Sequence, residues 1–122
     1  MEIVKGFPAT SQDNYQLNVT SIVKHAARVF GGQEIVSRRL DGGLYRYTYA
    51  EAYERMKRLA NGLRHIGVRV GDRVGVLAWN SHENYEIYFG LPGTGAVMLL
   101  LNLRLSPPDL AYVIDHSQAD FI

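Results

Sequence analysis

The spacing of apolar residues predicts a long amphipathic helix near the middle of the chain, over residues 49–66. One stripe of apolar side chains recurs three or four positions apart: Ala52, Tyr53, Met56, Leu59, Ala60, Leu63 and Ile66. That spacing is typical of a helix that buries one face. Thr48 and Glu51 have the spacing of a capping box, which satisfies two backbone N–H groups at a helix start. Gly67 is placed to end the helix in a left-handed conformation.

A shorter helix and a hairpin precede this long helix. Thr20 or Ser21 is the predicted cap of the first helix, and Gly31-Gly32 is predicted to end it. Its apolar positions also fall at helical spacing: Ile22, Ala26, Val29 and Phe30. Residues 34–38 and 45–48 alternate as strands, and the turn between them contains Asp-Gly and Gly-Gly, which favour a tight hairpin.

After residue 70 the pattern alternates between strand and helix. Predicted strands cover residues 73–79, 95–101 and 119–122. Asn80 or Ser81 is expected to cap a helix that runs to about residue 91, with Tyr85, Tyr88 and Phe89 facing inward. Residues 96–101 are all apolar, which predicts a strand buried on both faces.

Ser106 is expected to cap the last helix, because Pro107 and Asp109 favour a first helical turn. Its predicted buried stripe is Leu110, Val113 and Ile114, and residues 116–117 end it.

This order of elements predicts an α/β fold, with parallel-sheet βα units and an N-terminal β-hairpin. We expect residues 1–19 to form an extended N-terminal segment and residues 20–122 to form an incomplete α/β subdomain. The predicted strand at residues 119–122 is apolar. The leucine-rich run at residues 98–103 needs other elements to cover both of its faces, which three helices can only partly do. We therefore expect an exposed sheet edge that favours association.

Composition narrows the function classes. The 122 residues include 13 Lys+Arg and 12 Asp+Glu, for a formal net charge of +1, which gives no electrostatic reason to expect a nucleic-acid partner. The absence of cysteine excludes disulfides, thiolate metal sites and a cysteine nucleophile. No apolar stretch has the length of a membrane span or the pattern of an export signal, so we expect a cytoplasmic protein.

A search for catalytic motifs gives no candidate. The sequence has no phosphate loop of the G-x-x-x-x-G-K-[ST] type and no G-x-S-x-G elbow. Gly93-Thr94-Gly95 lies between a helix and a strand, the wrong order for holding a pyrophosphate, and is interpreted as a turn. The four histidines, His25, His65, His82 and His116, are interpreted as surface or helix-end residues. We therefore predict no catalytic, cofactor-binding or metal-ligating residue in this chain.

Several short motifs nevertheless occur in a characteristic order. They are Thr48-Tyr49-Ala50-Glu51, Leu59-Ala60-Asn61-Gly62-Leu63, Gly67-Val68-Arg69-Val70-Gly71-Asp72-Arg73-Val74, Asn80-Ser81, Gly95-Ala96-Val97, Asn102-Leu103-Arg104-Leu105-Ser106-Pro107 and Leu110-Ala111-Tyr112-Val113-Ile114. The set resembles the N-terminal part of the AMP-forming acyl-CoA synthetases, fatty-acid–CoA ligases of the adenylate-forming superfamily. The resemblance covers roughly residues 7–122. Phe7-Pro8-Ala9-Thr10, followed by Leu17-Asn18, looks most like the medium- and long-chain members.

The resemblance implies a partial N-terminal subdomain of the adenylate-forming fold. Its members use ATP and Mg²⁺ to convert a fatty acid into an acyl-adenylate, and then transfer the acyl group to coenzyme A. The motifs that bind phosphate, adenine and ribose in those enzymes have no counterpart in this sequence. This implies a ligase segment that binds no cofactor of its own and is catalytically inactive alone.

Two other functions fit the residues. The chain could be a stand-alone oligomerisation or interaction module that associates through an exposed sheet edge or its N-terminal segment. Alternatively, it could be a small ligand-binding α/β domain, because such sheets bind ligands beyond the carboxyl ends of their strands. Asn80-Ser81 and residues 102–106, including Arg104, would then form a site suited to a small anion.

Overall fold

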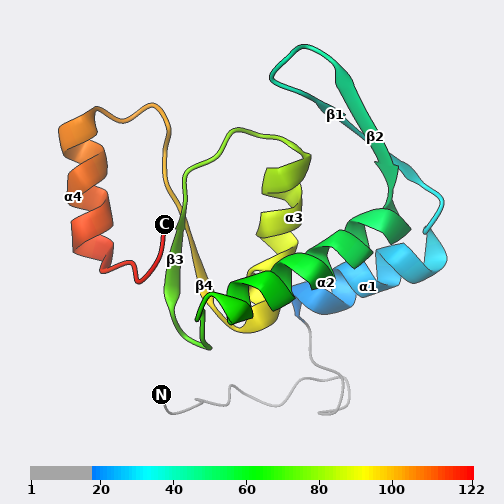
Figure 1. Ribbon diagram of the computed structural model, residues 1–122, viewed down its shortest axis with the longest axis horizontal. Helices are drawn as coiled ribbons and strands as arrows, with labels where there is room; N and C mark the ends of the chain where they lie inside the picture. The colour runs from blue at the N-terminus through cyan, green and yellow to red at the C-terminus, as the bar shows by residue number, and fades with distance from the viewer. Residues whose placement is uncertain (1–17) are drawn as a thin grey trace, which may run out of the picture.

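The computed structural model describes residues 18–122, and Figure 1 shows the order of their helices and strands. The elements are α1 (Val19–Val29), β1 (Glu34–Arg38), β2 (Leu44–Thr48), α2 (Tyr49–His65), β3 (Arg73–Val76), α3 (His82–Gly90), a 3₁₀ turn η1 (Pro92–Thr94), β4 (Val97–Leu100) and α4 (Pro107–Ser117). The predicted alternation of helices and strands is confirmed. No helix within residues 18–122 combines the length and apolar character needed to cross a membrane.

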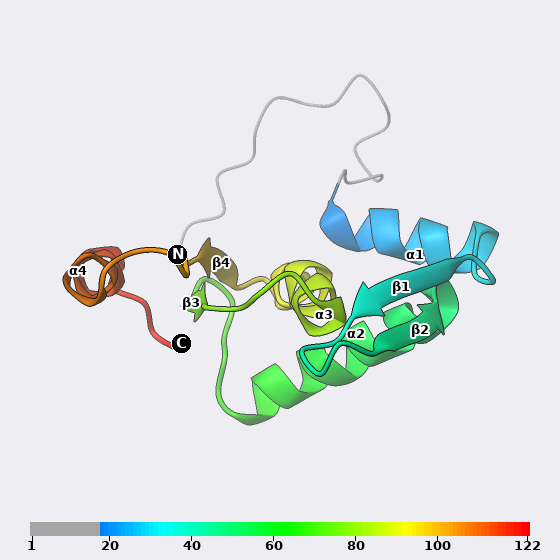
Figure 2. The same cartoon turned by 90° about the horizontal axis from the view of Figure 1, so that it is seen from above.

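The parallel sheet is centred on β3. β4 pairs with one edge of β3 in parallel, from Arg73 opposite Val97 to Val76 opposite Leu100. Phe121 bridges to Val74, also in parallel, and its carbonyl accepts from the backbone N–H of Gly75 at 2.8 Å. Since α3 leads from β3 to β4 and α4 leads back across β3, right-handed crossovers place the two helices on opposite faces. Both views show α3 and α4 on opposite sides of the sheet (Figures 1 and 2).

The two sheet strands are shorter than their apolar runs predict. β3 ends at Val76 rather than at residue 79, because the chain then turns toward α3. β4 begins at Val97 rather than at residue 95, because Gly95 has a left-handed φ of 88° and ends the 3₁₀ turn. The predicted strand at residues 119–122 is present as the single bridge at Phe121.

Two apolar clusters hold the fold. One joins the sheet to the end of α3 and consists of Val68, Val74, Val76, Leu91 and Ala96. The other joins α1, β2 and α2 and consists of Val23, Tyr47, Ala52 and Met56. The hairpin, the antiparallel pair β1–β2, therefore belongs to the helical part of the molecule rather than to the parallel sheet.

Most helix caps are those that the sequence predicts, but the predicted cap of α1 is wrong. Thr48 and Glu51 form the predicted capping box, Gly67 is left-handed with a φ of 104°, and Ser106 caps α4. The predicted cap of α1, Thr20 or Ser21, was wrong: Asn18 Oδ1 accepts from the backbone N–H of Ser21 at 2.8 Å. The helix thus begins at Val19, inside the segment expected to be extended. The rest of that segment lies outside the described residues.

Burial around β4 and α4 differs from the prediction. Val97 and Leu100 are 52% and 56% exposed, so the strand is not buried on both faces. No residue of α4 is fully buried, and its apolar stripe is only half-buried. Tyr88 on α3, expected to face inward, is 46% exposed. Within residues 18–122, nothing pairs with the outer edge of β4, and α4 stands apart from α1–α3 (Figures 1 and 2).

Candidate functional site

The carboxyl ends of β3 and β4 form the candidate site, because open α/β sheets bind ligands at this edge. A pocket of about 270 Å³ lies there, lined by residues 78–80 and 101–104. It brings together Asn80, Asn102 and Arg104, which belong to the two turns that the ligand-binding alternative named, 80–81 and 102–106. Ser81 is absent from its lining, because its hydroxyl caps α3 by accepting from the backbone N–H of Asn84 at 3.3 Å.

Local turns set the positions of these side chains. Asn102 Oδ1 accepts from the backbone N–H of Arg104 at 2.9 Å, which shapes the turn after β4. Asn80 Oδ1 accepts from the side-chain amide of Asn84 at 3.4 Å. Trp79 is 60% exposed beside them. A guanidinium, an amide and an open indole can receive a small anion, but they supply no nucleophile or general base.

A second pocket, of about 480 Å³, adjoins this edge between the hairpin tip and the start of α3. It shares Trp79 and Asn80 with the first and adds Arg38 and Arg39. Ser37 Oγ accepts from the backbone N–H of His82 at 2.9 Å and holds the two segments together. No local pattern predicts this approach of the hairpin, since the two bonded residues are 45 positions apart.

His82 is a helix-end residue, as one of the two predicted roles has it, because it begins α3, but it is not a surface residue. Its side chain is only 11% exposed, and its ring stacks on Tyr45 with the ring centroids 4.0 Å apart. The other three histidines are exposed, as expected.

A cluster of three side chains, Glu86, Arg55 and Tyr47, lies near the contact between His82 and Tyr45. Glu86 on α3 is 6% exposed, and its Oε1 accepts from Arg55 Nε on α2 at 2.6 Å. Tyr47, on β2, is 5% exposed. Burial, and then the negative charge of Glu86, raise the pKa of Tyr47 far above its usual range. Because each of these side chains comes from a different element, the group fixes the hairpin against α2 and α3.

The structure places the remaining candidate motifs in structural roles. Gly93 and Thr94 lie in the 3₁₀ turn, and a Cβ at Gly95 would meet Val70 Cγ2 at 3.0 Å. The turn interpretation of Gly93-Thr94-Gly95 is thereby confirmed. The described part of the chain also contains no group of three or more His, Cys, Asp or Glu side chains that could hold a metal ion.

Comparison with known proteins identifies the parent fold. The profile of the AMP-binding enzyme family matches residues 23–122. The long-chain-fatty-acid–CoA ligase of Thermus thermophilus is 45% identical over 117 residues, which are 96% of this chain and 21% of that enzyme.

Two solved structures share the fold. The inhibitor-bound N-terminal domain of FACL13 from Mycobacterium tuberculosis superposes with a TM-score of 0.72 at 26% identity, covering 85% of this chain and 26% of that one. A fatty acyl-CoA synthetase of the same organism gives a TM-score of 0.70 at 29% identity, covering 84% and 20%.

These matches confirm the resemblance drawn from the ordered motifs. The family profile, the curated ligase and the solved structures each match most of this chain. The chain spans about a fifth of the length of the curated ligase and corresponds to the N-terminal region of fatty-acid–CoA ligases. The family match covers most of the chain and continues to its last residue. The chain therefore belongs to the AMP-binding enzyme family.

Proposed function

We propose that this chain is the N-terminal part of a ligase that joins medium- or long-chain fatty acids to coenzyme A. The complete enzyme would use ATP and Mg²⁺ to form an acyl-adenylate, and then transfer the acyl group to the coenzyme A thiol. The observation that carries the proposal is the 45% identity, over nearly the whole chain, to a long-chain-fatty-acid–CoA ligase.

In this proposal the chain supplies scaffold rather than reacting groups. Adenylation must position a triphosphate, a metal ion and a carboxylate, and must stabilise charge developing at phosphorus. Residues 18–122 hold no candidate metal cluster, and in the turn at Gly93–Gly95 a Cβ added at Gly95 would meet Val70 Cγ2 at 3.0 Å, which indicates close packing at this turn. The carboxyl edge of β3 and β4 would contribute one wall, with Arg104, to the ligand-binding face of the complete enzyme.

The assay for this division of roles is pyrophosphate release with ATP, Mg²⁺ and fatty acids of different chain length. We expect no turnover above background from the purified chain. Turnover by the chain alone would show that residues assigned a scaffold role carry out chemistry. Calorimetry with ATP, AMP and coenzyme A tests the small ligand-binding alternative, for which we expect no heat of binding.

Self-association is the second candidate function, and the outer edge of β4 favours it. Val97 and Leu100 are more than half exposed on a strand whose outer edge has no partner among residues 18–122. Such an edge is a template for pairing with another strand. Light scattering would show a discrete dimer if this edge is a specific dimer interface. It would show ill-defined aggregates if the edge is a surface that other parts of a complete ligase bury. The cytoplasmic location expected from the sequence stays a prediction.

A further inference from the structure

The turn between β1 and β2 carries Asp41 followed directly by Gly42. Figure 1 shows this turn at the end of the hairpin that lies away from α1 and α2. Leu40, beside it, is 94% exposed, and the side chain of Asp41 is 65% exposed. Nothing in the proposed scaffold role uses this turn. Solvent therefore has access to the Asp41 carboxyl group and to the backbone beside it.

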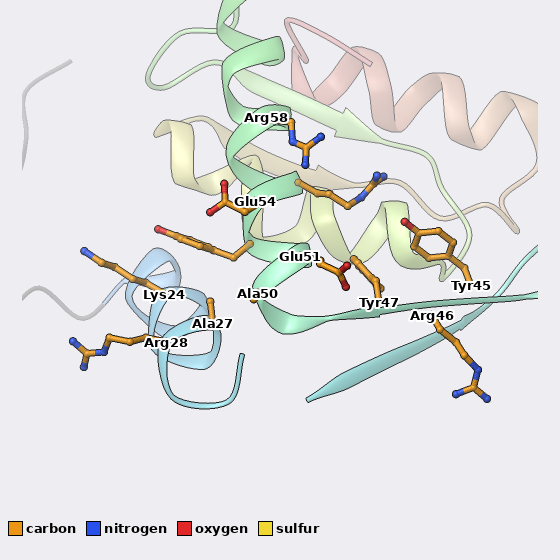
Figure 3. Close-up of a pocket in the computed structure, with 12 residues that line it drawn as sticks. Lys24, Ala27, Arg28, Tyr45, Arg46, Tyr47, Ala50, Glu51, Glu54 and Arg58 are labelled. Carbon is orange, nitrogen blue, oxygen red and sulfur yellow. The ribbon is translucent and has the colours of Figure 1, made fainter. Parts of the chain in front are cut away.

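The rest of the hairpin is anchored by its side chains. Figure 3 shows Tyr45 and Tyr47 projecting from β2 on the side of α2, whereas Arg46 points the opposite way. Tyr47 is buried, and Tyr45 stacks on His82 with the ring centroids 4.0 Å apart. On β1, Ser37 Oγ accepts from the backbone N–H of His82 at 2.9 Å. Because these contacts hold both strands, the turn can open locally without separating the hairpin from the helices.

The hydrogen bonds of the turn place the Asp41 carboxyl group beside the backbone that follows it. Its Oδ1 accepts from the backbone N–H of Gly43 at 2.9 Å. Gly42 has a φ of 86°, and no atom outside its two neighbouring residues lies within 4 Å of the place that a Cβ would take. No side chain therefore crowds the nitrogen of Gly42.

Two contacts of the turn oppose a reaction between these groups, and both are weak. The backbone N–H of Gly42 donates to the Arg39 carbonyl at 3.0 Å. Arg39 Nε lies 3.6 Å from Asp41 Oδ2, and both side chains are more than half exposed. A single turn hydrogen bond in an exposed loop opens at a low free-energy cost, and an exposed ion pair adds little to that cost.

We propose that Asp41 is a site of spontaneous isomerisation to isoaspartate. The backbone nitrogen of Gly42 attacks Cγ of Asp41 and loses its proton, while the carboxyl group loses one oxygen as water, so that a cyclic imide forms. Water then opens the imide at the former main-chain carbonyl, and the main chain afterwards runs through Cβ and Cγ. One water leaves and one enters, so mass and charge are unchanged and no co-reactant is needed. The proposal does not depend on the ligase function.

Asn61 followed by Gly62 is the matched comparison within the same chain. In an unfolded chain at neutral pH this pair reacts faster than Asp-Gly, because a neutral amide is a better electrophile than an ionised carboxylate. In the structure both residues lie inside α2, and the Gly62 carbonyl accepts from the backbone N–H of Ile66 at 3.1 Å. The helix fixes ψ at about −42° and holds each N–H on the carbonyl four residues earlier, which keeps the Gly62 nitrogen from the Asn61 side chain. The fold should therefore reverse the intrinsic order of the two sites.

Isomerisation would alter one defined part of the molecule. The extra main-chain carbon lengthens the turn and disrupts the bond from the backbone N–H of Arg39 to the Gly43 carbonyl, which is 2.8 Å long. Arg39 and Asp41 also line the pocket between the hairpin tip and the start of α3, so this pocket would change shape. The anchored strands would stay in place.

The test is incubation of the 122-residue chain in warm neutral buffer made with water enriched in heavy oxygen, followed by peptide mapping with mass spectrometry. An isoaspartate peptide elutes and fragments differently from its parent, and imide opening leaves heavy oxygen on residue 41. In the folded chain we expect Asp41 to isomerise at least tenfold faster than Asn61 loses its amide. In a chain unfolded by urea we expect Asn61 to react faster.

A pair of glycine variants tests the attacking nitrogen. Gly42→Ala should slow isomerisation at least tenfold, because a side chain crowds that nitrogen. Gly32→Ala, where nothing lies within 4 Å of the new Cβ, is the control and should change the rate less than twofold. Measuring Gly42→Ala in urea as well separates this crowding from any change in the turn, because the crowding persists in the unfolded chain.

Three results would overturn the proposal. The first is a folded chain in which Asn61 reacts at least as fast as Asp41, or in which Asp41 stays unchanged over the time that the unfolded chain takes to react. The second is a product at residue 41 that carries no heavy oxygen. The third is an unchanged rate in Gly42→Ala, both folded and in urea.

Discussion

Replacing Arg55 by methionine tests how the hairpin and α3 are held to α2. The substitution removes the guanidinium whose Nε donates to Glu86 Oε1 at 2.6 Å, but it keeps most of the aliphatic stem. The Glu86 side chain is only 8% exposed. The variant therefore leaves a negative charge in a poorly solvated position without its partner.

The size of the effect follows from burial. Removing one partner of a fully buried ion pair costs about 3 to 5 kcal/mol. The Arg55 side chain is 38% exposed, so water already screens part of this interaction. We expect a loss of roughly 2 kcal/mol in the free energy of unfolding. With an m value of about 2 kcal/mol per M, the midpoint of urea unfolding would fall by about 1 M.

The assay is urea unfolding of the chain followed by circular dichroism, with two comparison variants. Arg58→Met changes the same residue type on the same helix, where no carboxylate of residues 18–122 is paired with it, and should shift stability by less than about 0.5 kcal/mol. Glu86→Gln added to Arg55→Met should recover more than half of the loss, because the unpaired charge is gone. The charge argument is wrong if Arg55→Met lowers the free energy of unfolding no more than Arg58→Met does. It is also wrong if adding Glu86→Gln to Arg55→Met recovers none of the lost stability.

Two further predictions concern the turn at Gly95 and the cap of α2. Gly95→Ala should lower stability by about 1 to 3 kcal/mol, because its φ is 88° and the new Cβ would meet Val70 at 3.0 Å. Gly32→Ala, where nothing lies within 4 Å, should have a much smaller effect in the same thermal melts. Hydrogen bonds from Thr48 lower the pKa of Glu51, so its ionised form stabilises α2 above the ordinary glutamate pKa and loses that effect as the pH falls through the folded value. Glu51→Gln should therefore lower helix content at neutral pH and flatten its acid dependence, whereas an unchanged acid profile by circular dichroism would contradict this role.

The elements predicted correctly are those set by short-range chemistry. The capping box at Thr48 and Glu51, the left-handed Gly67 and the cap at Ser106 all depend on neighbours within a few positions. The cap of α1 was missed because Asn18, Thr20 and Ser21 are all good capping residues. Only the backbone geometry selects Asn18.

Long-range contacts were not predictable from the pattern. Arg55 and Glu86 are 31 positions apart, and each looks like an ordinary surface charge in its own helix. The enclosure of His82 by Tyr45 depends on how the hairpin folds back. The apolar run at β4 correctly predicted a strand, but apolar sequence alone does not say which elements cover it. The pocket at the carboxyl edge was partly foreseen, because Asn80 and Arg104 follow adjacent parallel strands.

If this chain is the N-terminal part of a fatty-acid–CoA ligase, it should work in place of the same part of a related enzyme. The most direct test replaces the matching 117-residue segment of the Thermus thermophilus ligase with this chain and measures ATP-dependent formation of long-chain acyl-CoA. The ligase lacking that segment is the control and should be inactive. We expect the chimera to form acyl-CoA, and a folded chimera that forms none would contradict the proposed function.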